Sequence, residues 1–239
     1  MNNLVDVHCH LSEENIFSEV PKAVKAGITR FISSALCQEE FEWHMNTDHS
    51  AMKWSAGIHP NYKKSKESDF QTLVKLCDQK KIIALGEVGL DKRNKDSTWQ
   101  KAILLKQLDL AANYDLPVIF HVVHQYYELH KLLKNNFPKI RGFLHAFSAS
   151  KEIAETFSKY DLAFSIGCKH PKLNCLEYIA KRGFLLFETD APYQKPPDSK
   201  QEENHLINLL WNVKTVSKLL KIQVDDLIEI QVGSYRSIF

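Results

Sequence analysis

Several histidines and carboxylates along the chain are suited to binding a metal ion. His8 and His10 are separated by one residue, so in an extended strand both side chains would point to the same side. Imidazole nitrogen and carboxylate oxygen atoms are ligands that zinc, manganese and similar divalent ions accept. The candidate ligands are His8, His10, Glu87, His121, His145 and Asp190. These residue types predict a catalytic metal centre, provided that the fold brings them together.

The five cysteines do not form a ligand motif. They are scattered along the chain, their number is odd, and no CxxC pair occurs among them. This usage fits a reducing compartment and argues against a closed, thiolate-bound structural zinc site. We therefore expect free cysteines and no disulfides.

Short apolar runs alternate with longer amphipathic segments, which is typical of βα units around a parallel sheet. The length of 239 residues is close to the roughly 250 of a (β/α)8 barrel, and no linker or repeat divides the chain. The sequence therefore predicts an α/β fold, a single (β/α)8 TIM-type barrel, with residues 1–239 as one domain. The expected strands are residues 4–7, 30–34, 53–57, 82–86, 117–120, 142–144, 162–165 and 184–187.

Helical spacing of apolar residues marks the longer segments between these runs. Residues 98–114 carry Ile103, Leu104 and Leu108 on one face, and residues 70–79 and 206–220 show similar stripes. Residues 192–204 form the longest polar stretch and are expected to be a loop.

Each candidate ligand lies at or just after the expected end of a strand. Glu87 follows the fourth run, between Gly86 and Gly89, and Asp190 follows the eighth. In a (β/α)8 barrel these strand ends meet on one face, where the active sites of the fold lie. The fold would thus gather six residues from five separate parts of the sequence.

Five short motifs occur in order along the chain. They are DVHCHL at 6–11, GIHP at 57–60, GEVGLD at 86–91, HAFS at 145–148 and ETDAP at 188–192. Each is weak alone, but five in this order at barrel spacing are specific. From residue 6 to residue 239 the chain resembles the TatD-like deoxyribonuclease family.

The resemblance implies a centre of two divalent metal ions per chain, either zinc, magnesium or manganese. The implied ligands are His8, His10 and Asp190 for one ion, His121 and His145 for the other, and Glu87 bridging both. Glu87 and Asp190 would be the catalytic residues, with Asp190 as the general base for an attacking water. The implied activity is hydrolysis of phosphodiester bonds in DNA or RNA, in the manner of a 3′–5′ exonuclease on single strands.

Basic and aromatic residues in loops after the strands are candidates for binding such a substrate. A basic rim attracts phosphates, and aromatic rings stack on bases of any identity. The expected substrate contacts are His59, Lys63, Arg93, His124, Phe147 and Lys169. Solvated surface lysines, a packed Phe147 and a turn shaped by His59 are the alternatives at these positions. Asp91, which ends the third motif, could hold a histidine ligand or cap a helix.

The composition of the chain indicates its cellular compartment and the kinds of partner it could bind. Apolar residues make up 44% of the chain and charged residues 25%, as in ordinary globular proteins, and the net charge is only +2. The start has no basic and apolar leader, and no run approaches the roughly 20 apolar residues of a membrane span. We expect a cytoplasmic protein, plausibly a monomer, with nucleic acid as its partner and no membrane association.

Two other function classes stay open. Metal-dependent amidohydrolases share this barrel and would cut an amide, ester or lactone, although Glu87 stands where many of them use a carboxylated lysine. A non-catalytic, metal-binding adaptor would be expected to have lost a ligand. Three departures from the family pattern, Val123, Glu203-Asn204-His205 and Ser234, put the substrate in doubt more than the reaction class, since an arginine that could bind phosphate is missing.

Overall fold

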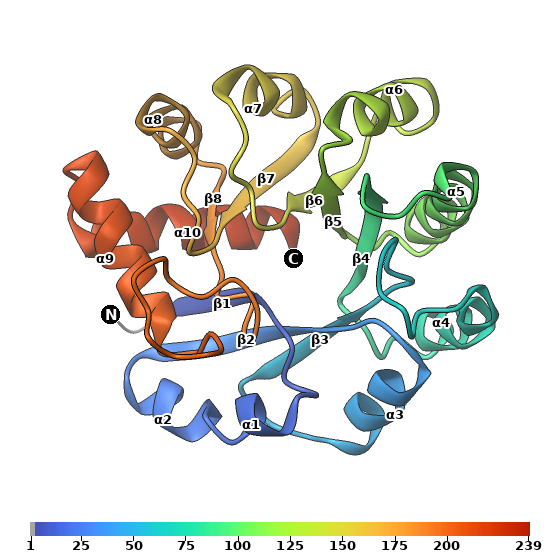
Figure 1. Ribbon diagram of the computed structural model, residues 1–239, viewed down its shortest axis with the longest axis horizontal. Coiled ribbons are helices and arrows are strands. Elements are labelled where there is room, and N and C mark those ends of the chain that lie inside the picture. The colour runs from blue at the N-terminus through green and yellow to red at the C-terminus, as the bar shows by residue number, and fades with distance from the viewer. Residues whose placement is uncertain (1–2) are drawn as a thin grey trace.

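Eight parallel strands form one sheet whose order in space is the order in the chain. The computed structural model describes residues 3–239, so Met1 and Asn2 of the predicted domain lie outside the described residues. The strands curve into a nearly closed ring (Figure 1), which confirms the predicted (β/α)8 barrel; that the chain forms one domain stays a prediction. The strands are β1 (Leu4–Cys9), β2 (Ile28–Ala35), β3 (Met52–Ala56), β4 (Ala84–Asp91), β5 (Val118–Val123), β6 (Arg141–Leu144), β7 (Asp161–Ile166) and β8 (Leu185–Phe187).

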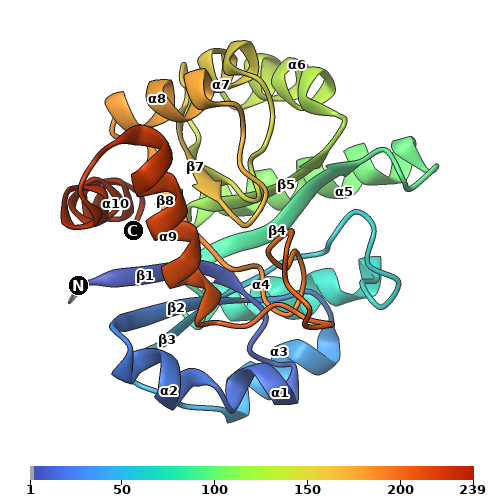
Figure 2. The same cartoon turned by 60° about the vertical axis from the view of Figure 1, so that its left-hand side comes forward.

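Helices lie outside the ring of strands (Figures 1 and 2). They are α1 (Glu14–Phe17), α2 (Val20–Lys25), α3 (Gln38–Asn46), the 3-10 turn η1 (Glu67–Asp69), α4 (Phe70–Asp78), α5 (Ser97–Asn113), α6 (Tyr126–Asn136), α7 (Lys151–Phe157), α8 (Leu173–Lys181), α9 (Asn208–Leu220) and α10 (Val224–Ile238). The long helix predicted over residues 98–114 is α5, whose N-cap Asp96 accepts a hydrogen bond from Trp99 N at 2.9 Å. No helix within residues 3–239 is long and apolar enough to cross a bilayer.

Two apolar cores hold the barrel together. The larger one lies between strands and helices, and Cys9 belongs to it, so this side chain points away from the barrel interior. The smaller core gathers residues of seven strands with one residue of α10: Val5, Val7, Ile32, Ala84, Ile119, Phe143, Ala163, Leu186 and Ile238. Because α10 closes the end of the barrel where the strands begin, access to the interior is left to the opposite end.

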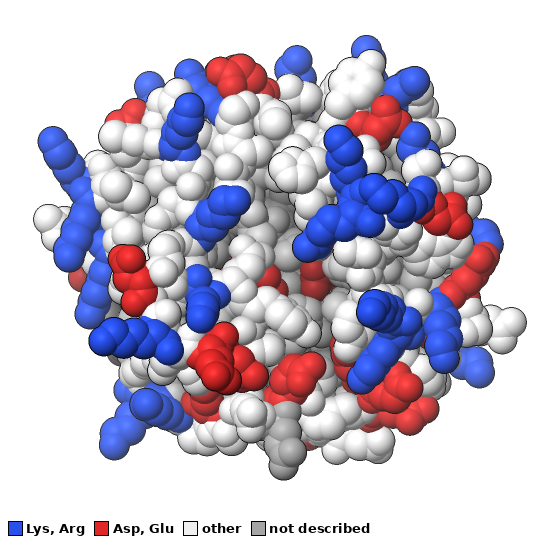
Figure 3. All heavy atoms as spheres, viewed as in Figure 1, with Lys and Arg blue, Asp and Glu red and all other residues white. Residues whose placement is uncertain are grey.

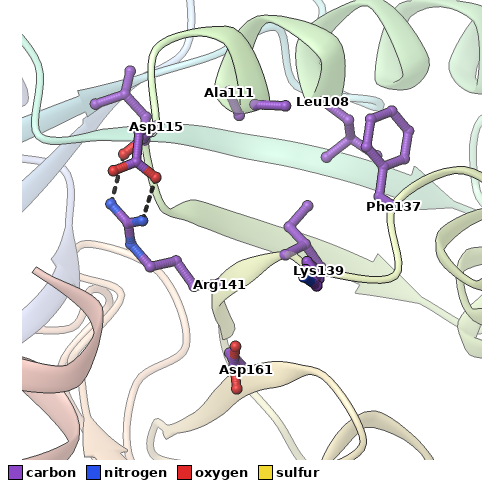
Figure 4. A pocket seen from close by; sticks show the side chains of 10 residues that line it. Leu108, Ala111, Asp115, Phe137, Lys139, Arg141 and Asp161 are labelled. Atoms are coloured by element: carbon purple, nitrogen blue, oxygen red, sulfur yellow. Dashed lines mark hydrogen bonds and ion pairs between the residues drawn. The ribbon is translucent and has the colours of Figure 1, made fainter.

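The end closed by α10 is fixed by polar contacts. The Gln231 amide donates to Val5 O at 2.6 Å and accepts from Val5 N at 3.4 Å. A hollow of about 290 Å³ lies at the same end, and beside it Arg141 pairs with Asp115 at 2.6 Å and donates to Ile238 O at 3.1 Å (Figure 4). Since Arg141 is occupied in anchoring α10, we assign this hollow a structural role.

The first and last strands are joined where β8 ends. Asp190 N donates to His8 O, and His10 N donates to Ala191 O, both at 2.9 Å. The buried Asp6 carboxylate accepts from Thr189 N at 3.0 Å and from the Thr189 hydroxyl at 2.6 Å. Burial raises the pKa of Asp6 to about 7, against these hydrogen bonds. This closure brings Asp190 beside the two histidines of β1.

Strand β4 is longer than the sequence indicates. Glu87 was expected after the strand, but it lies inside β4, which stays paired with β5 as far as Asp91. The register shifts between Gly86 and Val88, and an irregularity of this kind re-aims a side chain without ending the strand. The expected boundary is therefore wrong, and β4 pairs with β5 both before and after Glu87.

Gly89 allows β4 and β5 to approach closely. A β-carbon at this position would lie 1.9 Å from His121 O, and the φ of +155° is itself unfavourable for other residues. Gly233 on α10 is the opposite case, because a β-carbon there would meet nothing within 4 Å.

We expect Gly89→Ala to lower the free energy of unfolding by about 3 kcal/mol, because the new methyl group would displace the backbone of His121. Gly233→Ala is the matched control and should raise it by about 0.5–1 kcal/mol, since alanine favours the helix. Urea denaturation followed by circular dichroism measures both. Equal stability of Gly89→Ala and wild type would contradict the close approach.

His44 on α3 is a buried, uncharged histidine. Its Nδ1 donates to Glu40 O at 2.7 Å, its Nε2 lies 2.7 Å from the Ser33 hydroxyl, and its ring stacks on Trp54. Burial lowers the pKa of His44 to about 4, so the folded protein keeps the ring neutral where an unfolded chain would protonate it.

From pH 6.5 down to about 4 the unfolded chain therefore binds one more proton at His44 than the folded protein does. Over this window His44 should make the folded state less stable by about 1.4 kcal/mol per pH unit. We expect His44→Phe, which keeps a ring beside Trp54, to show a shallower loss of stability on acidification. Parallel pH profiles of wild type and variant in chelator would disprove this.

Candidate metal centre

The six candidate ligands lie together at the open end of the barrel, with Glu87 in the middle. Glu87 Oε1 is 3.2 Å from His8 Nε2 and 3.3 Å from His10 Nε2. Glu87 Oε2 is 2.9 Å from His145 Nε2 and 3.3 Å from His121 Nδ1. One carboxylate therefore faces two pairs of imidazoles, one pair with each oxygen.

Asp190 completes the group around His8 and His10. Its Oδ1 lies 3.4 Å from His8 Nε2 and 3.3 Å from His10 Nε2. The residue has a left-handed backbone with φ of 54°, which is uncommon outside glycine and concentrates at functional sites. Asp190 and Glu87 thus present oxygen atoms to the same two nitrogens.

The other ring nitrogens of His8 and His10 are held by β2. The Ser34 hydroxyl lies 3.0 Å from His8 Nδ1, and His10 Nδ1 is 3.2 Å from Ser34 O. Because a carbonyl only accepts, His10 carries its proton on Nδ1 and turns the lone pair of Nε2 towards the carboxylates. Ser34 was not among the predicted site residues; its only signal in the sequence is that it is a polar residue inside an expected strand.

Carboxylates hold the histidines of the second pair. Asp91 Oδ2 is 3.0 Å from His121 Nε2, so Asp91 holds the ring of this candidate ligand and does not cap a helix. The fully buried Glu188 has Oε1 3.6 Å from His145 Nδ1 and accepts from Ala146 N at 2.8 Å. A contact such as that of Asp91 fixes the tautomer and orientation of a histidine, whereas the Glu188–His145 distance is longer than a hydrogen bond. Glu188 lies in one of the five motifs, but no role was predicted for it.

Buried charges raise and lower the pKa values in this cluster. Burial alone would lower the pKa of His8, but Glu87 and Asp190 raise it well above its usual value. Burial likewise opposes protonation of His145, yet Glu87 raises its pKa to about 10. Despite burial, the histidines hold the pKa of Glu87 and of Asp190 below the usual range. The carboxylates are therefore ionised and require positive charge beside them.

The donor set fits divalent cations. His8 Nε2 is fully buried and has no hydrogen-bond partner among the described residues, although two carboxylates lie within 3.4 Å. Imidazole nitrogens and carboxylate oxygens that converge in this way are the ligand types that zinc and similar divalent ions accept, and groups of these atoms lie close enough together to hold an ion. His121 Nδ1 and His145 Nε2 lie 3.0 Å apart, within hydrogen-bonding distance, and both face Glu87 Oε2.

A groove of about 540 Å³ opens beside His121 and His145. Three of the expected substrate contacts line it, and all three are exposed: Arg93, His124 and Lys169. Arg93 also pairs with Asp91 at 2.5 Å. Val123, at one of the departures from the family pattern, lines an apolar part of the groove with Tyr126 and Ile153.

The remaining expected contacts lie elsewhere. His59 is inside the site, with Nε2 3.7 Å from Glu87 Oε2, and burial together with His121 holds its pKa well below the usual value. Lys63 is exposed after β3 and is not among the residues that line the groove. Phe147 corrects an expectation, because its fully buried ring packs against Phe164 and cannot stack on a base.

Lysine and arginine side chains stand around a hollow in the centre of the face seen in Figure 3. Acidic atoms are visible within the hollow and along its lower rim, so positive charge is concentrated on only part of the edge. An anionic ligand would be attracted to that part of the edge and to cations within the site.

Comparison with known proteins identifies the family. A family described as TatD related DNase matches residues 5–239. The chain belongs to this family. A metal-dependent hydrolase of Buchnera aphidicola, itself uncharacterised, is 27% identical over 99% of this chain and 98% of its own length. The 3′-5′ ssDNA/RNA exonuclease TatD of Pantoea ananatis is 28% identical over 82% of each protein.

Solved structures of the TatD family share the fold. The TatD homologue YjjV from Escherichia coli K12 matches with a TM-score of 0.87 and 24% identity, over 99% of this chain and 97% of that one. The chain is thus a TatD-family metal-dependent hydrolase with a TIM barrel.

Other departures from the family pattern lie away from the ligands. Ser234 is buried on α10, where its hydroxyl donates to Gly183 O at 2.7 Å. His205 pairs with Glu19, and Asn204 donates to Thr189 O at 2.6 Å. Asn204 and His205 fasten the polar loop before α9, whereas Ser234 ties α10 to the turn before β8. None of the three contributes an atom to the cluster of candidate ligands.

We expect Asp91→Asn to weaken metal binding about 10- to 100-fold, because the amide holds His121 less firmly and in either tautomer. Titration with zinc against a chromophoric chelator measures the affinity. Asp96→Asn in the same loop is the control, since asparagine caps α5 equally well. Unchanged affinity in Asp91→Asn would show that His121 needs no such support.

Proposed function

We propose that this protein is a two-metal nuclease that hydrolyses phosphodiester bonds of single-stranded DNA or RNA from the 3′ end. The observation that carries the proposal is Glu87, whose two oxygens face separate pairs of histidines beside a groove edged by Arg93 and Lys169. Two comparisons support the proposal. The family is described as TatD related DNase, and several relatives are named exonucleases.

In this proposal His8, His10 and Asp190 would hold one divalent ion, His121 and His145 would hold the other, and Glu87 would be shared between them. Such ions supply Lewis acidity towards a phosphate and lower the pKa of water nearby. Zinc, magnesium and manganese all accept part or all of this donor set.

The side chains of the site have separate tasks. Asp190 takes the proton of the attacking water and returns it to the leaving oxygen. His59 accepts a hydrogen bond from Asn61 N at its Nδ1, at 2.9 Å, so its neutral ring carries a proton on Nε2. That N–H points into the site and can donate to a phosphate oxygen. Arg93 and Lys169 attract the chain of phosphates along the groove.

The test uses metal-depleted wild type and Glu87→Gln with single-stranded DNA or RNA labelled at the 5′ end, after magnesium, manganese or zinc is restored. We expect a ladder that shortens from the 3′ end, and a loss of about 1000-fold or more in Glu87→Gln, because both ions lose their shared ligand. Glu128→Gln removes an exposed ion pair with Lys101 and should keep wild-type activity.

Esters, amides and p-nitrophenyl phosphodiesters are assayed beside the nucleic acids. Cleavage of amides or esters alone by a folded, metal-loaded wild type would replace the nuclease by the amidohydrolase alternative. Metal binding without cleavage of any of these substrates would favour the adaptor. A ladder that starts at internal positions would retain the nuclease and refute the 3′ exonuclease mode.

A further inference from the structure

The two oxygens of Asp190 have different neighbours. Oδ1 faces His8 and His10, whereas Oδ2 lies 2.5 Å from Nε2 of Gln194. An ionised carboxylate only accepts hydrogen bonds, so the amide nitrogen of Gln194 is the atom that faces it. The oxygen directed away from the histidines is therefore already occupied by a donor.

The backbone of Gln194 is anchored for this contact. It has a left-handed φ of 48°, and its carbonyl accepts from Asn204 Nδ2 at 3.4 Å. Asn204 is fully buried and also donates to Thr189 O at 2.6 Å, directly before Asp190. Its Oδ1 accepts from Asn208 Nδ2 at 2.8 Å at the start of α9. Asn204 thus ties the loop that carries Gln194 to the end of β8.

On its other side the Gln194 side chain lies close to the end of β7. Gly167 follows this strand, and the Gln194 Oε1 lies 4.0 Å from where a β-carbon of Gly167 would be. The side chain therefore lies across the end of β7 to reach Asp190, and it also lines the groove.

We propose that Gln194 is a positioning residue that makes Asp190 bind its metal ion through Oδ1 alone. A carboxylate that binds through both oxygens occupies two coordination positions, and the amide at Oδ2 prevents this arrangement. A coordination position then stays open for water or substrate, as catalytic sites require. The inference rests on the proposed function only in taking Asp190 as a metal ligand.

The test is a double-mutant cycle with Gln194→Leu, Asp190→Ala and the double variant, read as affinity for cobalt and zinc. We expect Gln194→Leu to weaken the binding of one of the two ions about 10- to 100-fold, as the loss of a residue that orients a metal ligand does. In the Asp190→Ala background the same change should cost less than about twofold, because Gln194 acts through Asp190. Gln201→Leu, in the same loop, is the matched control and should bind as wild type does.

The visible spectrum of the cobalt-loaded protein gives a second measurement that needs no activity. If Asp190 in Gln194→Leu turns to bind through both oxygens, the coordination number rises and the absorption becomes weaker than in wild type. Wild-type affinity together with a wild-type spectrum in Gln194→Leu would overturn the proposal. Equal losses in both backgrounds would also overturn it, because Gln194 would then act independently of Asp190.

Steady-state kinetics separates positioning from contact with the substrate. If Gln194 positions Asp190, Gln194→Leu should lower kcat and leave KM unchanged, together with the weaker metal binding. A raised KM with wild-type metal affinity would instead make Gln194 a substrate contact. If wild type binds two ions but cuts no nucleic acid, the nuclease proposal fails while the metal data still decide the role of Gln194.

Discussion

The site depends on the contacts of the Glu87 carboxylate with four histidines. Its two oxygens lie within 3.3 Å of four imidazole nitrogens that come from β1, β5 and the end of β6. One carboxylate can face both pairs of histidines only if it lies at the centre of the barrel mouth with both oxygens accessible. The shifted register at Glu87 and the close approach of β4 to β5 at Gly89 provide that placement.

Closure of the barrel places Asp190 beside His8 and His10. The backbone bonds between Asp190 and His8 and the bonds of Asp6 to Thr189 place the end of β8 directly beside β1. The apolar interior and α10 fill the opposite end. As a result, the strand ends meet in one ring, and Ser34, Asp91, Glu188 and Gln194 contact the candidate ligands from the surrounding strands and loops. Preorganisation of this kind is what a catalytic metal site requires.

The buried charges explain why this face is suited to cations. Ionised Glu87 and Asp190 lie in a region from which water is largely excluded, where an uncompensated charge is costly. Raised pKa values at His8 and His145 show the same demand for positive charge. Two divalent ions would meet this demand and would, in turn, attract an anionic substrate towards a groove with Arg93 and Lys169 at its edge.

Much of the protein was determined by its sequence. Alternating apolar runs located all eight strands, and five motifs indicated the family and the ligands, because ligand type and strand position are local properties. Tertiary structure alone decided that Glu87 lies inside β4, that Phe147 is packed away from the groove, and that Ser34, Glu188 and Gln194 contact candidate ligands. Those roles depend on which side chains meet across separate strands, and that is set by register and barrel closure rather than by any pattern along the chain.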